Sequence, residues 1–517
     1  MQVSEFEDSP SKNRHPYYDD SMLYPAAPEW STGEVLLSSA YRRFILGIPE
    51  SEINLDDIEQ ARVSMPANVG GQDAWSKLLV ERGGISSPLK HGQHSPVASR
   101  QLMPIVPSVA RIAGVLGKRP RSRWNPSNLL LQTIGAGLGP AANASLLREF
   151  GDAMMVTTTD DIFARFVDSA LQQGLRGIGP SPAATPPFRA LALADESLRA
   201  FRAQPTPTRL CPSERFCKDL PSVLGTKQSL TRRQWTVLVE SILRVGLGMH
   251  VLWTCNANTL VWDLVLDVAS GGPVPSATEL EALIWEGRGR PHALLELGSD
   301  AEPHIKRLIE RYAFARTGLN LLLCRLDDVG ASMAQGTSLG FAPPPAPSAP
   351  ASLAGFLAHV AAHRHQVDPS DAGQWLRRQV SGMFDTNQEL RELAKCGSGY
   401  TKNLLEFSRH SLGQIKAKDP EQRCYDLAYL LAYSGERKPL TVHPGPAMLV
   451  MLVHGCCRAN PQIPASLDDF RQYLGEYGLN VRAGELIEGK TGHDLAMLGL
   501  VIDSPDAAGG RLLVPPF

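Results

Sequence analysis

The spacing of apolar side chains predicts a mainly helical chain. Between Thr159 and Gly174, apolar residues recur every three or four positions, as on one face of an α-helix. They are Ile162, Phe163, Phe166, Val167, Ala170 and Leu171. Thr159 is the expected N-terminal cap of this helix and Gly174 its end. A second run with the same spacing comprises Ile305, Leu308, Ile309 and Tyr312.

The most apolar stretch of the chain, Trp235–Ala269, predicts buried helices. Thr231 and Gln234 precede it with the spacing of a capping box, which marks a helix start. Charged and polar residues interrupt the stretch at Glu240, Arg244, His250, Asp263 and Asp267. A membrane span needs roughly 20 consecutive apolar residues, so these interruptions argue against a membrane helix.

At the C-terminal end, the pattern predicts three helices followed by a β-hairpin. The helices are expected at Pro446–Cys457, Ser466–Tyr473 and Gly484–Leu498, and the hairpin strands at Leu500–Ile502 and Leu512–Val514. In this element order, the segment Leu440–Phe517 resembles winged-helix modules. The resemblance implies a third helix that enters a DNA groove or a surface that docks a protein. Eight acidic and four basic residues from Ser466 onward, a net charge of −4, favour protein docking.

Two proline-rich segments divide the chain into predicted domains. Pro343–Pro350 is expected to form an extended polyproline spacer, and Gly177–Pro187 a second break. The predicted fold is therefore mainly α and multidomain, with irregular helical N-terminal and middle regions and a C-terminal winged-helix-like α+β module. The divisions are a flexible tail at 1–30, a helical N-terminal domain at 31–177, a helical middle domain with a basic stretch at 190–335, a proline-rich linker at 336–352, a helical domain at 353–439 and the winged-helix-like module at 440–517.

Composition narrows the class of protein. The 517 residues are 43% hydrophobic and 20% charged, which is typical of globular proteins, and their number exceeds what one core normally holds. The N-terminal segment lacks the apolar core of a secretory signal, so we expect a cytoplasmic protein with no membrane contact. Eight cysteines, spread along the chain without metal-ligand spacing, predict reduced thiols and no zinc site.

Basic residues gather in two segments despite a net charge of only −2. The first segment runs from Arg111 to Arg123 and ends beside Trp124. The second segment, Arg199–Arg233, holds eight basic and two acidic residues, a net charge of +6. Cationic surfaces with interleaved aromatic rings suit contact with phosphates and bases. The predicted nucleic-acid-binding residues are Lys118, Arg119, Arg121, Arg123, Trp124, Arg215, Lys218, Arg232 and Arg233. Solvent-facing loops are the alternative explanation for both segments.

Catalytic and ligand-binding patterns occur only in isolated form. Gly484–Thr491 matches the letters of a P-loop, but its loop carries Glu485 and Glu488 where phosphates would sit. Imidazoles occur together at His359, His363 and His365, and a lone His-Asp pair at His493. Nuclease-like triplets of carboxylates and lysine are Asp426, Glu436 and Lys438, or Asp469, Glu488 and Lys490. We expect no cofactor or bound metal, and a protein more suited to binding than to catalysis.

The sequence thus predicts a noncatalytic adaptor, or nucleic-acid-associated subunit, of a bacterial multi-protein machine. Its basic segments would contact DNA or RNA phosphates, and its acidic C-terminal module would dock partner proteins in the complex. Two alternatives stay open. One is a helical protein-interaction scaffold without nucleic acid, and the other a divergent metal-dependent nuclease.

Overall fold

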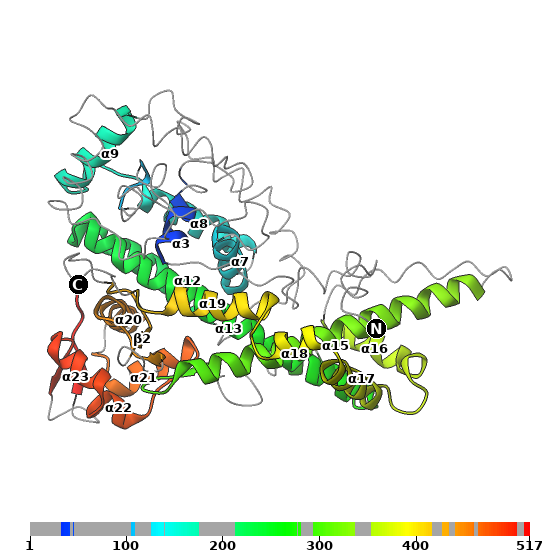
Figure 1. The fold of residues 1–517 in the computed structure, drawn as a ribbon. Coiled ribbons are helices and arrows are strands. Elements are labelled where there is room, and N and C mark those ends of the chain that lie inside the picture. Colours follow the sequence, from blue (N-terminus) through cyan, green and yellow to red (C-terminus); the bar gives the residue numbers. More distant parts are fainter. Residues whose placement is uncertain are drawn as a thin grey trace.

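The computed structural model is built mostly of α-helices, with a few short strands (Figure 1). The mainly helical character predicted from the sequence is confirmed. The structure describes residues 33–41, 45, 105–108, 126–138, 140–174, 212–276, 278–280, 293–336, 353–415, 426–433, 440–459, 464–503 and 511–517.

The long helix α13 (Arg232–Ala269) forms the axis of the described structure. It begins with the predicted capping box, in which Thr231 and Gln234 bond each other's backbone amides. Among the described residues, α13 is the one helix that is long and apolar enough to cross a membrane. However, 94% of its most apolar 18-residue stretch is buried inside the protein. The expectation of a buried segment is therefore confirmed, as one continuous helix.

Helices pack around α13 on several sides. Close to its N-terminal half lie α12 (Pro212–Gly225) and the 3₁₀ helix η7 (Thr226–Ser229), and α12 in turn contacts α7 (Pro126–Leu138) and α8 (Pro140–Met154). Gly246 allows the close crossing of α12, since a Cβ there would come within 2.2 Å of the Phe216 ring. The short helix α3 (Gly33–Ala40) packs on α13 and α7.

The remaining helices before the C-terminal region flank α13 and a second long helix, α15 (Ala301–Gly336). They are α16 (Leu353–Val367), α17 (Ala372–Thr386), α18 (Gln388–Ala394) and α19 (Gly399–Leu412). In Figure 1, α16 and α17 lie toward the C-terminal end of α13, and α20 to α23 toward the opposite end with the chain terminus.

Helix α9 (Ile162–Gly174) forms as predicted, but its N-terminal cap and its buried face differ from those expected from the sequence. Its N-terminal cap is Asp161, whose Oδ1 accepts the amide of Ala164 at 2.9 Å, because a carboxylate at this position reaches that amide directly. Thr159 instead contacts the hydroxyl of Thr157. The buried face carries Ala164 and Val167, whereas Ile162 is 77% and Phe166 52% exposed.

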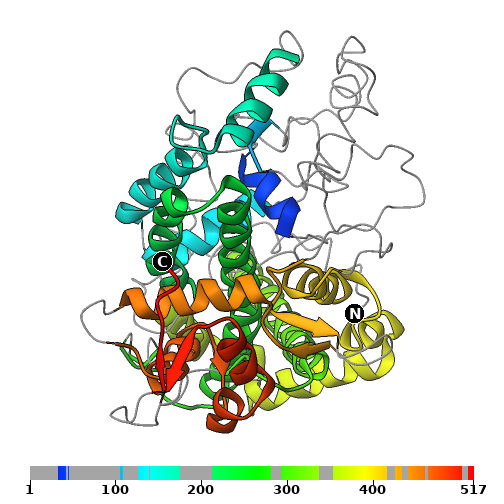
Figure 2. The same cartoon turned by 90° about the vertical axis from the view of Figure 1, so that its left-hand side faces the viewer.

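The C-terminal region contains the predicted elements in the predicted order. These are α20 (Pro446–Ala459), α21 (Leu467–Glu476), α22 (Ala483–Ile487), α23 (Lys490–Met497) and the antiparallel strands β5 (Val501–Asp503) and β6 (Arg511–Leu513). The third predicted helix is split at Glu488 and Gly489, and the Glu485 side chain accepts the amide and the hydroxyl of Thr491 in the first turn of α23. Figure 2 shows α20 in orange across the core, with the red hairpin beside it.

Two further pairs of strands join distant parts of the chain. β1 (Leu295–Glu296) pairs in parallel with β4 (Leu479–Asn480), and β2 (Leu431–Tyr433) pairs antiparallel with β3 (Leu440–Val442). One hydrophobic cluster extends from Leu36 to Leu513. The predicted domain division stays a prediction, since both proline-rich breaks lie outside the described residues.

Candidate functional site

The predicted nucleic-acid-binding residues fall into three structural groups. Lys118, Arg119, Arg121, Arg123 and Trp124 lie outside the residues that the structure describes. Arg215 and Arg232 are buried, and Lys218 and Arg233 are exposed.

The Arg232 guanidinium lies inside the protein, with its side chain fully shielded from solvent. It donates to the Ile105 carbonyl at 2.9 Å, to Asp160 at 3.1 Å and to the Tyr41 hydroxyl at 2.9 Å. Its guanidinium also stacks over the Trp235 ring. These contacts join the start of α13 to segments far away in the sequence, which makes Arg232 a structural residue here.

Arg215 on α12 takes part in a second buried network. Its guanidinium bonds Asp219 and lies 3.3 Å from Glu476, while the hydroxyls of Tyr473 and Tyr477 donate to Asp219 at 2.6 and 2.8 Å. Nearby charges, Asp219 above all, hold the pKa of Arg215 above its usual value against the effect of burial. The network ties α12 to α21. Among the four described basic candidates, Lys218 and Arg233 are thus the ones that face solvent.

Two of the carboxylates considered for catalysis, Asp426 and Asp469, have structural partners. Asp426 forms a two-pronged pair with Arg244, at 2.8 and 3.2 Å, and accepts the amides of Ile415 and Ala428. Asp469 completes the capping box of α21 with Ser466. Glu436 and Lys438 lie outside the described residues, whereas Glu488 and Lys490 are exposed.

The histidine candidates do not form a metal centre among the described residues. The rings of His359 and His363 lie 4.2 Å apart, and Nδ1 of His363 is 2.9 Å from the His359 carbonyl. His493 is exposed, and its neighbour Asp494 pairs with His443 at 2.9 Å. No group of three or more His, Cys, Asp or Glu side chains in the described part is arranged to hold a metal ion.

The P-loop-like segment is occupied by its own side chain. Glu485 Oε1 accepts the Thr491 amide at 3.0 Å and the Thr491 hydroxyl at 2.7 Å. In a P-loop, the amides at the start of the helix would point to phosphate. Here a carboxylate fills that position at α23, so the geometry agrees with the charge argument against nucleotide binding.

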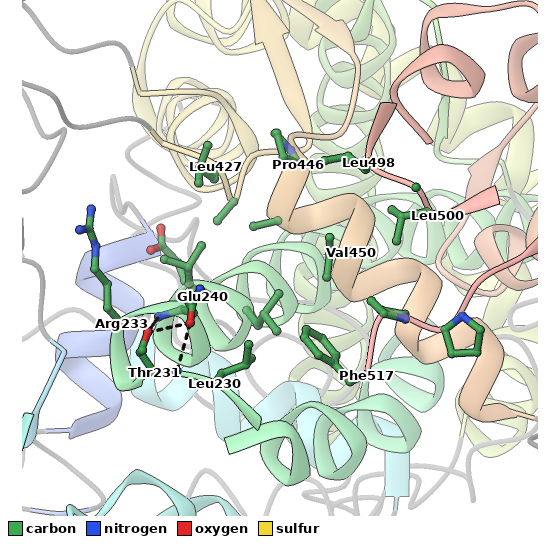
Figure 3. Close-up of a pocket in the computed structure, with 18 of the residues that line it drawn as sticks. Leu230, Thr231, Arg233, Glu240, Leu427, Pro446, Val450, Leu498, Leu500 and Phe517 are labelled. Carbon is green, nitrogen blue, oxygen red and sulfur yellow. Dashed lines mark hydrogen bonds between the residues drawn. The ribbon is translucent and has the colours of Figure 1, made fainter. Parts of the chain in front are cut away.

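An apolar cavity of about 880 Å³ lies between the first turns of α13, α20 and the end of the chain (Figure 3). Its walls combine segments that are far apart in the sequence, and their apolar members include Val237, Leu427, Val450, Leu498, Leu500 and Phe517. No sequence motif indicates it, because each segment contributes only a few apolar residues. Leu427, Leu498 and Phe517 are 41%, 40% and 37% exposed, so the cavity opens to the surface.

Polar groups lie at two places along the cavity. Glu240 and Asp426 line the inner wall and share the Arg244 guanidinium, with Glu240 at 3.2 Å. Burial, the largest influence, raises the pKa of Glu240 to about 7, helped by the nearby Asp426 and opposed by Arg244. At the rim, Thr231 and Gln234 cap each other and Arg233 projects outward (Figure 3).

The arrangement can therefore bind an apolar group and place polar atoms at its two ends. Cavities of this size, with mostly apolar walls and a few polar groups, are typical ligand-binding sites. No protein-family model, curated protein or solved structure matches this chain.

Proposed function

We propose that the protein is a noncatalytic adaptor in a bacterial multi-protein machine of the cytoplasm, and that it binds a partner protein at the cavity beside α20. The observation that carries the proposal is the open apolar cavity between α13, α20 and Phe517. Apolar surface left open to water favours association, because removing it from water contributes about 25 cal/mol per Å² against the entropy cost of binding.

A protein partner is favoured over a small metabolite by the surface around the cavity. Beyond the rim residue Leu498, α23 and β5 also expose Met497 (73%) and Ile502 (54%). Large apolar side chains exposed on adjacent segments are typical of protein-interaction surfaces. A small ligand inside the cavity would leave these side chains in water.

The proposed role is noncatalytic because two of the three described carboxylates of the nuclease-like triplets, Asp426 and Asp469, already have structural roles, and the third, Glu488, lies exposed. Asp426 is shared between Arg244 and two backbone amides, Asp469 caps α21, and Glu485 caps α23. A catalytic carboxylate must instead reach substrate or metal.

The order of the C-terminal elements supports the winged-helix resemblance of Leu440–Phe517, with its acidic surface toward protein. α20, α21 and the split α22 and α23 are followed by the β5–β6 hairpin. Leu498 and Leu500, at the junction of α23 and β5, line the cavity. In this proposal the module contributes one wall of the partner site.

The test is a selection of short displayed peptides on the immobilised full chain and on Val450→Trp. Val450 is half-buried and lines the cavity, so an indole there fills the space. Selected peptides are expected to bind Val450→Trp at least about tenfold more weakly, a loss of about 1.4 kcal/mol.

The matched control is Ala459→Trp, which adds the same ring at an exposed position of α20 outside the cavity. Circular dichroism establishes that both variants fold. Peptides that bind parent and Val450→Trp equally, or no binding peptide at all, would overturn the proposal.

Nucleic-acid contact is a second candidate function, favoured by one observation in the sequence. No acidic residue interrupts the basic segment that ends beside Trp124. Its basic residues include Lys118, Arg119, Arg121 and Arg123. Such a segment suits phosphate contact with base stacking. Exposed Lys218 and Arg233 are available to the same partner, although Lys218 also pairs with Glu214.

A further inference from the structure

Arg233 gives the cavity a distinct charge at its mouth. It lies on the first turn of α13, lines the cavity and is exposed (Figure 3). Its neighbours are engaged: Arg232 is buried among carbonyls and Asp160, and Gln234 is part of the capping box. Arg233 itself has no hydrogen-bond or ion-pair partner in the part of the chain that the structure describes.

The other charged side chains lining the cavity are compensated inside its wall. Asp426 accepts from Arg244 and from two backbone amides, and Glu240 lies 3.2 Å from the same guanidinium. The Arg244 guanidinium also donates to the carbonyls of Ser411 and Gly413, each at 2.6 Å. Among the described lining residues, Arg233 is therefore the one whose positive charge faces solvent.

We propose that the occupant of the cavity is a partner-protein segment whose apolar side chains fill the space beside Val450 and whose acidic side chain pairs with Arg233. The inference rests on the proposed function, because it specifies the chemistry of the partner at the same site. A guanidinium forms two parallel hydrogen bonds with a carboxylate, which adds geometric selectivity to charge attraction. The apolar wall supplies burial, and Arg233 selects among apolar segments.

The experiment repeats the peptide selection with the charge at the mouth reversed. Peptides selected by the parent are expected to be enriched in Asp or Glu next to apolar residues, and those selected by Arg233→Glu in Lys or Arg. A single acidic peptide should bind Arg233→Glu about tenfold more weakly, and its Glu-to-Lys version should regain most of that loss. The matched control is Arg458→Glu, an exposed charge on α20 outside the cavity, which should leave binding unchanged.

The outcomes separate this inference from the function on which it rests. Peptides that depend on Val450 but show no acidic preference, and that bind Arg233→Glu as tightly as the parent, would overturn the inference and leave the adaptor function standing. Failure to select any cavity-dependent peptide would overturn both. Dodecanoate binding that Arg233→Glu abolishes, without any selected peptide, would assign the cavity to a small amphipathic carboxylate instead.

Discussion

The guanidinium of Arg244 and the carboxylate of Asp426 face each other across 182 residues of sequence, with N–O distances of 2.8 and 3.2 Å. Arg244 is fully buried and also contacts Glu240 on its own helix. The pair joins α13 to the segment before β2, and its carboxylate, Asp426, lines the inner wall of the cavity. Since buried charges are costly unless paired, this contact holds the wall in place only while both partners are present.

Arg244→Met is expected to destabilise the protein by about 3–5 kcal/mol, because Asp426 then remains buried without its cation. Adding Asp426→Asn should recover part of the loss, since the buried negative charge is gone and the single amide oxygen can still accept one of the two backbone amides. Urea unfolding measures the free energies. As a control, Arg311→Met removes an exposed pair with Asp263 and should cost less than about 1 kcal/mol. Equal losses in the two single variants would contradict the buried pair's role.

Glu240→Gln is expected to change how stability depends on pH. Burial raises the pKa of Glu240 from 4.5 to about 7, so the folded protein holds a proton that the unfolded chain releases. The stability that this proton provides is fully present below pH 4.5 and is lost as the pH rises through about 7. The parent should therefore lose up to about 3 kcal/mol relative to Glu240→Gln across this window. Urea unfolding at several pH values measures the difference, and exposed Glu389→Gln serves as the control.

His250→Gln tests the opposite dependence. Burial lowers the pKa of His250 to about 3, and its Nδ1 lies 2.7 Å from the Ser213 hydroxyl. The unfolded chain takes up the proton first, so the contribution of neutral His250 is present above pH 6.5 and is lost toward pH 3. On acidification the parent should lose up to about 1.4 kcal/mol per pH unit relative to the variant. His365→Gln, at an exposed position, should keep the parental slope; a parental slope in His250→Gln as well would refute the assignment.

Local patterns in the sequence predicted local structure well. The capping box at Thr231 depends on two residues three positions apart, so the sequence contains all that determines it. The mainly helical character and the order of the C-terminal elements follow from periodicity in the same way.

Features that depend on distant partners could not be predicted. Arg215 and Arg232 count as positive charge in the sequence, yet their burial is set by Glu476, Tyr41 and other residues far along the chain. The cavity could not be predicted for the same reason, since α13 and α20 both contribute to its walls and no pattern in either helix indicates that they meet there. On α9, periodicity predicted the helix but not which apolar residues, such as Ile162, would stay exposed.

Glu485→Ala is expected to weaken α23. The carboxylate accepts from the amide and the hydroxyl of Thr491, and losing a helix cap costs about 1 kcal/mol. Glu488→Ala, an exposed change in the same segment, should cost less than about 0.5 kcal/mol. Thermal unfolding compares them, with Mg-ATP added in a parallel series. A stabilisation of the parent by Mg-ATP that Lys490→Ala removes would show that the segment binds nucleotide after all.

Reversing Arg119, Arg121 and Arg123 to Glu tests the second candidate function. If these residues contact phosphates, binding of labelled single- or double-stranded DNA or RNA should weaken steeply with salt in the parent. Each lost contact should lower the slope of log affinity against log salt by about 0.9 for duplex DNA or 0.7 for single strands.

Reversing exposed Lys218 tests the edge of the second basic segment. Arg232→Glu is unsuitable, since it would place a carboxylate beside buried Asp160 and disturb the fold. Fluorescence anisotropy across a salt series measures the slopes. Absence of binding at low salt would reject nucleic-acid contact and leave the protein-binding cavity as the functional surface.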